Sequence, residues 1–154
     1  MKRVKKAARA DNVLGLVHVL SSLIGRAFHG QVALRHRISL PEWRVLVTLA
    51  NHPGSTAVEI VERWAMQPMM ASRAIRQLKR RGWIERKVRR DDRRSYALWL
   101  SEKGRQAYRR VRPSANQRYH QIVGSLAPRE LALLERALHR LTQRTRRLAE
   151  DLGS

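Results

Sequence analysis

The chain has 154 residues, 43% of them hydrophobic, which is enough for one folded domain and excludes a disordered basic tail. Its 33 Lys and Arg against 12 Asp and Glu give a formal net charge of +21, which indicates a polyanionic partner. The chain has no cysteine, which excludes disulfides and thiolate metal sites. We expect no apolar run of membrane-spanning length, and therefore a cytoplasmic, nucleoid-associated protein without a membrane partner.

The first helix is predicted to span about residues 4–36. One apolar face repeats there at helical spacing, formed by Val13, Val17, Leu20, Ile24 and Phe28. A capping box from Ser39 to Glu42, with Pro41 in the first turn, predicts the start of a second helix that ends at residues 51–54. The expected buried face of this helix consists of Trp43, Leu46, Val47 and Ala50.

A helix-turn-helix is predicted next. A second capping box, Thr56 to Glu59, opens a short helix that runs to Trp64, and residues 66–67 make the turn. The helix that follows is predicted over Pro68–Arg81, with Gly82 as its terminator. Its inward stripe comprises Ala71, Ile75 and Leu78, and its outward face comprises Met69, Ser72, Arg73, Arg76, Gln77 and Arg80.

Two short strands are predicted over residues 83–88 and 95–100, which are rich in aromatic and β-branched residues. They flank a charged tip, Arg89-Arg90-Asp91-Asp92-Arg93-Arg94. A helix-turn-helix beside a basic hairpin is a winged helix-turn-helix, which aims one helix at a DNA major groove and can place the hairpin on the backbone or in the minor groove. The fold class is therefore mainly α with a small β-hairpin wing.

Two further helices are predicted from about residue 102 to residue 152. The first uses Tyr108, Val111, Ala115, Tyr119 and Ile122 as its apolar side, and Pro113 is expected to bend it. The second carries a heptad seam: Leu131, Leu134, Leu138, Leu141, Thr145, Leu148 and Leu152. Because the winged domain (about 40–100) has its own core, these terminal helices favour pairing with a second copy of the chain, although packing on each other within a monomer is the alternative.

The candidate DNA-binding residues lie on the predicted recognition helix and the wing. Arg73, Arg76 and Arg80 can pair with guanine or grip phosphate, while Ser72 and Gln77 are adaptable donors and acceptors. The helix start at Pro68 favours phosphate. Met69 and Met70 could each contact a thymine methyl or belong to the core, and for Met70 the two alternatives are equal.

On the wing, Asp92 is spaced to hold the Arg94 guanidinium in one orientation across the turn. The remaining tip arginines, Arg89, Arg90 and Arg93, are expected to contact phosphate. The alternative for Asp92 and Arg94 is an exposed salt bridge, which contributes little to stability.

Three stretches closely resemble the MarR family of transcription regulators: Leu40-Pro41-Glu42-Trp43, the run from Leu78 to Ile84, and Asp91-Asp92-Arg93-Arg94 followed by Leu98 to Gly104. The resemblance implies a single domain over residues 1–154, in which helices at about 4–36 and 102–152 form a homodimer. It implies that two winged domains address successive major grooves of a pseudo-palindromic operator in double-stranded DNA. It also implies that Arg94, oriented by Asp92, enters the minor groove.

The family resemblance further implies repression relieved by a small effector, commonly an aromatic acid or its thioester, bound between the dimerisation helices and the winged domain. The candidate ligand residues are Arg26, His29 and Trp43, each of which could instead be solvated or packed. Pro68-Met69-Met70 departs from the small polar residues that are usual at this helix start, so the operator sequence cannot be transferred from relatives.

Two other classes compete with the repressor hypothesis. An architectural DNA-compacting protein would suit the high charge, and it would differ by showing little preference among DNA sequences. An enzyme is disfavoured because the sequence has no Gly-rich phosphate loop, nucleophile elbow or paired metal spacing such as H-E-x-x-H. We expect no cofactor and no metal.

Overall fold

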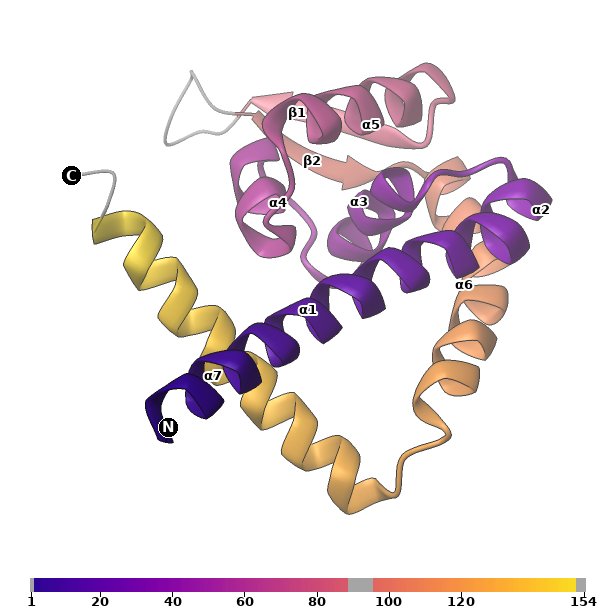
Figure 1. Cartoon of the computed structure of the whole chain (residues 1–154). Helices are drawn as coiled ribbons and strands as arrows, with labels where there is room; N and C mark the ends of the chain where they lie inside the picture. Colours follow the sequence, from indigo (N-terminus) through magenta and orange to yellow (C-terminus); the bar gives the residue numbers. More distant parts are fainter. Residues whose placement is uncertain (1, 89–95, 152–154) are drawn as a thin grey trace. The chain divides into compact units, whose positions relative to one another are not determined.

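The computed structural model describes residues 2–88 and 96–151, which form helices and one antiparallel hairpin (Figure 1). The chain divides into two compact units, Met1–Ala115 and Asn116–Ser154. The first unit holds the long N-terminal helix, the helix-turn-helix and the hairpin. The second holds the end of α6 and the last helix.

The N-terminal helix is continuous but not uniform. It consists of α1 (Lys2–Phe28), one π-helical turn (His29–Ala33) and α2 (Leu34–His36). It ends at Arg37, whose φ of 51° is left-handed, while the Ile38 N–H donates back to the Ala33 carbonyl. The prediction of one helix to residue 36 is confirmed except for the π turn, and of the predicted apolar face only Phe28 is buried.

One sequence expectation about this helix was wrong. Asn12–His36, with a mean hydropathy of 1.3, is long and apolar enough to cross a membrane, and it is the one such helix among the described residues. Length and composition alone do not distinguish a membrane helix from a helix that pairs with another chain. Phe28, Val32 and Ala33, within this segment, are buried in the core of the first unit.

The helix α3 (Leu40–Asn51) begins with the predicted capping box: Ser39 Oγ accepts from the Glu42 N–H, and the Glu42 carboxylate accepts from the Ser39 N–H. Its predicted buried face was wrong in part, because only Leu46 of the four is fully buried. Trp43, Val47 and Ala50 are half-buried at its edge. The buried positions are Glu42, Val45, Leu46, Thr48 and Leu49.

The helix-turn-helix is formed by α4 (Ala57–Trp64) and α5 (Pro68–Arg80). The predicted Thr56–Glu59 capping box opens α4. Trp64 Nε1 donates a hydrogen bond of 2.9 Å to Thr48 Oγ1, which links the end of α4 to α3. Ala65 then turns the chain with a φ of 46°, and Met66 is buried beneath the turn.

The hairpin packs against this unit through one face. β1 (Ile84–Val88) pairs with β2 (Tyr96–Leu100) in the register Ile84 to Leu100 and Val88 to Tyr96. Ile84, Leu98 and Leu100 are buried in the core cluster with Leu78 of α5. The strand predictions are confirmed to within one residue at each end.

The helix α6 (Glu102–Val123) starts where the hairpin ends, with Ser101 as its cap. It continues through Pro113 and buries Gly104, Ala107 and Val111. Of its predicted apolar side, Val111 is buried, whereas Tyr119 is 49% exposed.

In the second unit, α7 (Pro128–Asp151) is the predicted seam helix, and none of its residues is buried. The Glu130 carboxylate accepts from the Ala127 N–H, which is one half of a capping box; Ala127 has no side-chain oxygen for the other half. The exposed leucines include Leu134, Leu138, Leu141 and Leu148; Leu152 lies outside the described residues.

Candidate nucleic-acid interface

The helix α5 is held by one apolar stripe and leaves the opposite face exposed. Ala71, Ala74 and Leu78 are buried and Ile75 is half-buried, so the predicted inward stripe is confirmed, with Ala74 added. The predicted outward face is also confirmed as exposed: Met69, Ser72, Arg73, Arg76, Gln77 and Arg80.

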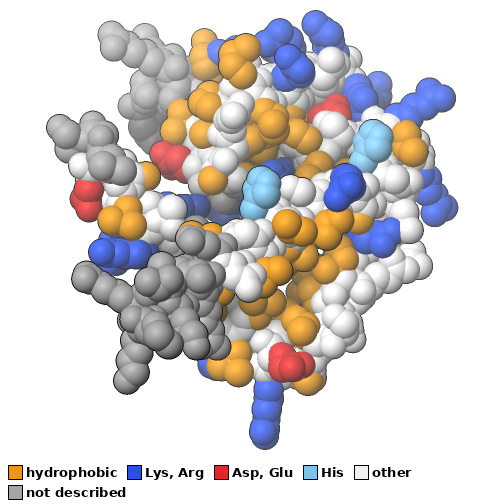
Figure 2. Space-filling view, in the orientation of Figure 1, with side chains coloured by type: hydrophobic (Ala, Val, Ile, Leu, Met, Phe, Trp, Pro, Cys, Tyr) orange, Lys and Arg blue, Asp and Glu red, His pale blue; other side chains and the backbone are white. Residues whose placement is uncertain are grey.

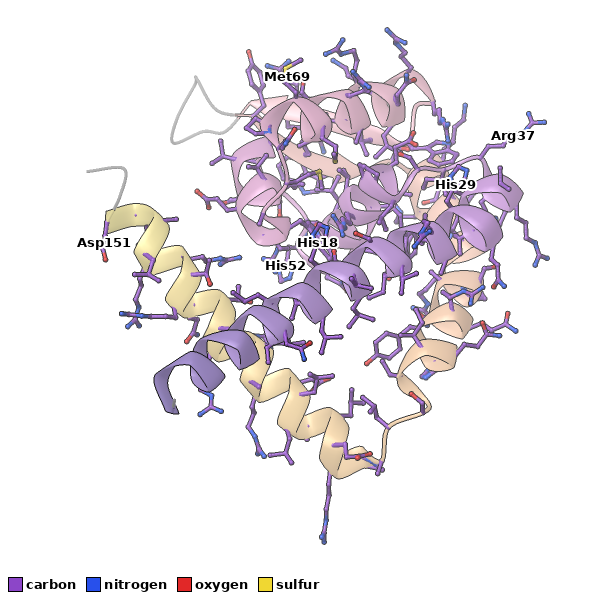
Figure 3. All side chains as sticks on the ribbon, viewed as in Figure 1. His18, His29, Arg37, His52, Met69 and Asp151 are labelled. Carbon is purple, nitrogen blue, oxygen red and sulfur yellow. The ribbon has the colours of Figure 1, made fainter. Side chains whose placement is uncertain are left out.

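Both methionines at the start of α5 face solvent. Met69 is 73% exposed and projects from the outer side of the helix (Figure 3), and Met70 is 44% exposed. Met70 is therefore not part of the core, and its contact with a DNA groove stays a prediction. An exposed thioether can contact a thymine methyl group without a hydrogen bond.

The charge on α5 has one sign. The helix carries Arg73, Arg76, Lys79 and Arg80 and no Asp or Glu. Lys and Arg side chains gather along this edge of the first unit (Figure 2). Such a face attracts phosphate and leaves the guanidinium groups available for base edges.

The start of α5 differs from the starts of α3 and α4. Gln67, at the N-cap, makes no side-chain capping bond, and Pro68 has no N–H to satisfy. No acidic residue lies in the first turn. The positive end of the helix dipole therefore has neither a side-chain cap nor a carboxylate in its own first turn, which suits an external phosphate.

The end of α5 is fixed by a Schellman motif. The Gly82 N–H donates to the Lys79 carbonyl and the Trp83 N–H to the Leu78 carbonyl, with Gly82 at a φ of 68°. Ser101 Oγ donates to the Gly82 carbonyl at 2.6 Å and accepts from the Gly104 N–H. A Cβ at position 104 would overlap the Trp83 carbonyl, so α6 begins in direct contact with this turn.

The described part of the wing presents cations stacked on aromatic rings. The Arg86 guanidinium lies over the Tyr96 ring, 3.0 Å from its centroid, and Lys87 Nζ lies 5.4 Å from the centroid of Trp99. The face of an aromatic ring attracts a cation, which favours these positions of the long side chains. The predicted tip residues lie outside the described residues: Arg89, Arg90, Asp92, Arg93 and Arg94.

The three ligand candidates lie in different surroundings. Arg26 and His29 are exposed, and Trp43 stacks on Tyr108 with ring centroids 5.4 Å apart and 15° between the planes. A cavity of about 730 Å³ lies elsewhere, between α4, α5 and the hairpin. Its lining, which the sequence did not predict, includes Val58, Val61, Ile75, Tyr96 and Leu98.

Two further charged residues were assigned no interface role from the sequence. Glu42 was read only as a capping residue, yet it is buried and lies 3.5 Å from Arg81 Nη2, beside the end of α5. No local signal predicts this contact, because the partners are 39 positions apart. Among residues 2–88 and 96–151 there is no group of three or more His, Asp or Glu that could hold a metal.

The sequence of the winged helix-turn-helix is similar to that of known proteins. Residues 38–96 match the MarR family. The transcriptional repressor MprA of Escherichia coli is 36% identical over 81 residues, which cover 53% of this chain and 46% of MprA. The chain thus spans about half the length of the curated relatives that it matches.

Two solved structures share the fold over most of the chain. One is the structure of BpsR from Bordetella bronchiseptica, which concerns the regulation of BpsR DNA binding by 6-hydroxynicotinic acid. It has a TM-score of 0.75 and 21% sequence identity, and the match covers 85% of this chain and 98% of BpsR. The other is of a mutant MarR from Escherichia coli complexed with operator DNA, with a TM-score of 0.74, 19% identity and coverage of 86% and 95%.

Proposed function

We propose that the chain is a transcription regulator of the MarR family that binds a specific DNA operator as a homodimer, because residues 38–96 match that family over the winged helix-turn-helix. Repression is the favoured direction, since the curated relatives are repressors. The observation that carries the proposal is the outward face of α5, which is exposed, cationic and free of carboxylates. In this geometry α5 enters the major groove, and the tip residues Asp92 and Arg94 are assigned to the minor groove.

The proposed dimer rests on apolar surface that remains exposed on the single chain. On α1 this surface comprises Val13, Leu14, Leu16, Val17, Val19, Leu20, Leu23 and Ile24, and on α7 it comprises Leu133, Leu134, Leu138, Leu141 and Leu148. In soluble proteins, a large exposed apolar patch usually marks an interaction site. A second copy of the chain supplies a matching surface, and its symmetry explains a pseudo-palindromic operator.

The proposed effector is an aromatic carboxylic acid or its thioester, held by Arg26, His29 and Trp43. Support comes from the chemistry of these side chains, which offer two cationic-capable groups and an aromatic ring. The structure of BpsR, a protein of the same fold, concerns regulation of its DNA binding by an aromatic acid. Binding would favour a dimer whose recognition helices no longer match the operator spacing.

The test separates this proposal from an architectural role. The full-length protein is titrated against DNA flanking its own gene and against unrelated DNA of equal length, at several salt concentrations. A regulator should prefer one flanking site by at least about 10³-fold, and affinity for it should fall roughly 10³–10⁵-fold between 50 and 200 mM salt. Equal affinity for both DNAs would indicate an architectural protein, and a flat salt dependence would exclude this binding mode.

A further inference from the structure

The carboxylate of Glu42 lies between Ser39, just before α3, and Arg81, just after α5. The residue is 6% exposed, and its Oε2 accepts from both the Ser39 N–H at 2.8 Å and the Ser39 hydroxyl at 2.6 Å. Its Oε1 is buried and accepts no hydrogen bond among the described residues. A buried carboxylate oxygen without a hydrogen bond is unfavourable, so this arrangement needs a physical reason.

A cation, Arg81 at the C-cap of α5, lies close to that oxygen. Arg81 Nη2 lies 3.5 Å from Glu42 Oε1, which is longer than the 2.7–3.2 Å typical of an N–H···O hydrogen bond. The Arg81 guanidinium also lies over the Trp83 ring, 5.0 Å from its centroid. A shift of less than about 1 Å at the end of α5 would turn this ion pair into a charge-assisted hydrogen bond.

The contact lies at a junction of three elements. The end of α2 leads through Ile38 and Ser39 into the capping box that Glu42 completes. The start of α6 is bound to the Gly82 and Trp83 carbonyls through Ser101. Both segments that lead toward the proposed dimerisation helices therefore meet the recognition helix at residues 81–83.

We propose that Glu42 is a positioning residue that sets the orientation of the recognition helix by holding Arg81, and that the contact closes when α5 docks on DNA. This inference rests on the proposed function and deepens it. Arg81 then acts through Glu42 rather than on DNA. Arg80 and Arg81 are both exposed, but Arg81 faces Glu42 and the Trp83 ring. The chain offers a control, because Glu59 makes the same capping box at α4 and has no ion pair described for it.

The binding experiment uses full-length Glu42→Gln, Arg81→Met and the double variant. Glutamine keeps an oxygen for Ser39 but loses the charge, and methionine keeps the packing on Trp83. Each single variant should weaken binding to the operator about tenfold, and the double variant should lose no more than either, because the pair acts as a unit. The slope of log affinity against log salt should stay unchanged, since no phosphate contact is lost.

The matched variants should behave differently. Glu59→Gln should bind the operator like the parent protein. Arg80→Met should weaken binding and reduce the salt slope by about one, as loss of a phosphate contact does. The opposing result is that Arg81→Met reduces the salt slope by about one, with a loss of affinity that adds to the loss in Glu42→Gln when the two are combined. That result would mean that Arg81 contacts DNA directly, and it would overturn the proposal.

A second readout does not depend on DNA. Amide hydrogen exchange of the free protein should accelerate at Gly82 and Trp83 in both Glu42→Gln and Arg81→Met, and stay unchanged in Glu59→Gln. Unchanged exchange at these amides in a folded Arg81→Met protein would overturn the positioning role. If the parent protein binds no operator while exchange responds as expected, the proposed function fails and the Glu42–Arg81 coupling stands.

Discussion

The arginines near the recognition helix differ in how they are held. Arg73, Arg76 and Arg80 are exposed on a helix without carboxylates, whereas Arg81 faces a buried carboxylate and an indole ring. Arg86 is ordered by Tyr96 on the hairpin. An arginine that is free to extend can grip phosphate or guanine, while a held one fixes local geometry.

The wing residues give the first prediction. Arg94→Ala should weaken operator binding by roughly 1–3 kcal/mol and leave folding intact, as loss of one specific contact does. Asp92→Ala should show much of the same loss, because the group proposed to aim Arg94 is removed. Binding titrations with circular dichroism as the folding control decide it. Parent-like affinity in Arg94→Ala would mean that the wing assignment is wrong.

The second prediction concerns pH. Burial, together with Arg35 and Arg110, lowers the pKa of His36 below its usual value of 6.5, and its Nε2 lies 3.0 Å from Ser114 Oγ. The folded state favours the neutral imidazole. The contribution of His36 to the free energy of unfolding is therefore fully present above pH 6.5 and is lost as the pH falls through the lowered pKa. Between pH 8 and pH 5, the melting temperature of His36→Gln should therefore fall less than that of the parent. Equal falls would contradict the assignment.

At the scale of elements, local signals predicted helix starts well. Both capping boxes are present as the sequence indicates, because each needs only two side chains three positions apart. The buried face of α3 was misplaced by one position, a rotation of about 100°. Its buried Glu42 and Thr48 are polar residues with partners on other elements, Arg81 and Trp64, which sequence periodicity cannot see.

Other features of the fold and the site depend on distant contacts. The π turn at His29–Ala33, the Glu42–Arg81 pair and the cavity between α4, α5 and the hairpin have no signature within a short window. The exposed face of α5 was predictable, since a two-faced helix needs only its own sequence. The roles of its side chains on DNA, and those of the wing tip, remain predictions.

The third prediction concerns α7. Truncation after Ser125 removes the entire predicted seam from Leu131 to Leu152, and the product should be monomeric or aggregated. It should also lose tight operator binding, because two half-sites can no longer be engaged together. Analytical ultracentrifugation and footprinting measure both effects. A soluble truncated monomer with full affinity and an unchanged footprint would refute the dimer.

For the whole molecule, two kinds of surface have different proposed partners. The cationic face of α5 has no carboxylate on its own helix, and the apolar faces of α1 and α7 are exposed on the single chain. We propose a polyanion as the partner of the first surface and a second copy of the chain as the partner of the others. The proposed dimer would carry two recognition helices related by symmetry, which is what a pseudo-palindromic operator requires.

The fourth prediction concerns the effector. An aromatic acid that binds the DNA-free dimer more tightly should raise its melting temperature, and saturating operator DNA should weaken the acid's binding by the same factor by which the acid weakens DNA binding. Trp43→Ala should reduce the thermal shift. The measurement is a screen of aromatic acids and their thioesters. If no compound stabilises the protein or releases DNA, the effector proposal is wrong, and the DNA-binding proposal is unaffected.

The most direct test of α5 as the recognition helix uses the chain's lack of cysteine. A single Ser72→Cys substitution on the exposed face can carry an iron chelate that cleaves DNA beside it, with Glu135→Cys on α7 as the control. The account predicts two clusters of cuts in the major groove, one in each half-site and about one helical turn apart, from the Ser72→Cys conjugate alone. Uniform cutting, or clusters of equal strength from the control, would contradict it.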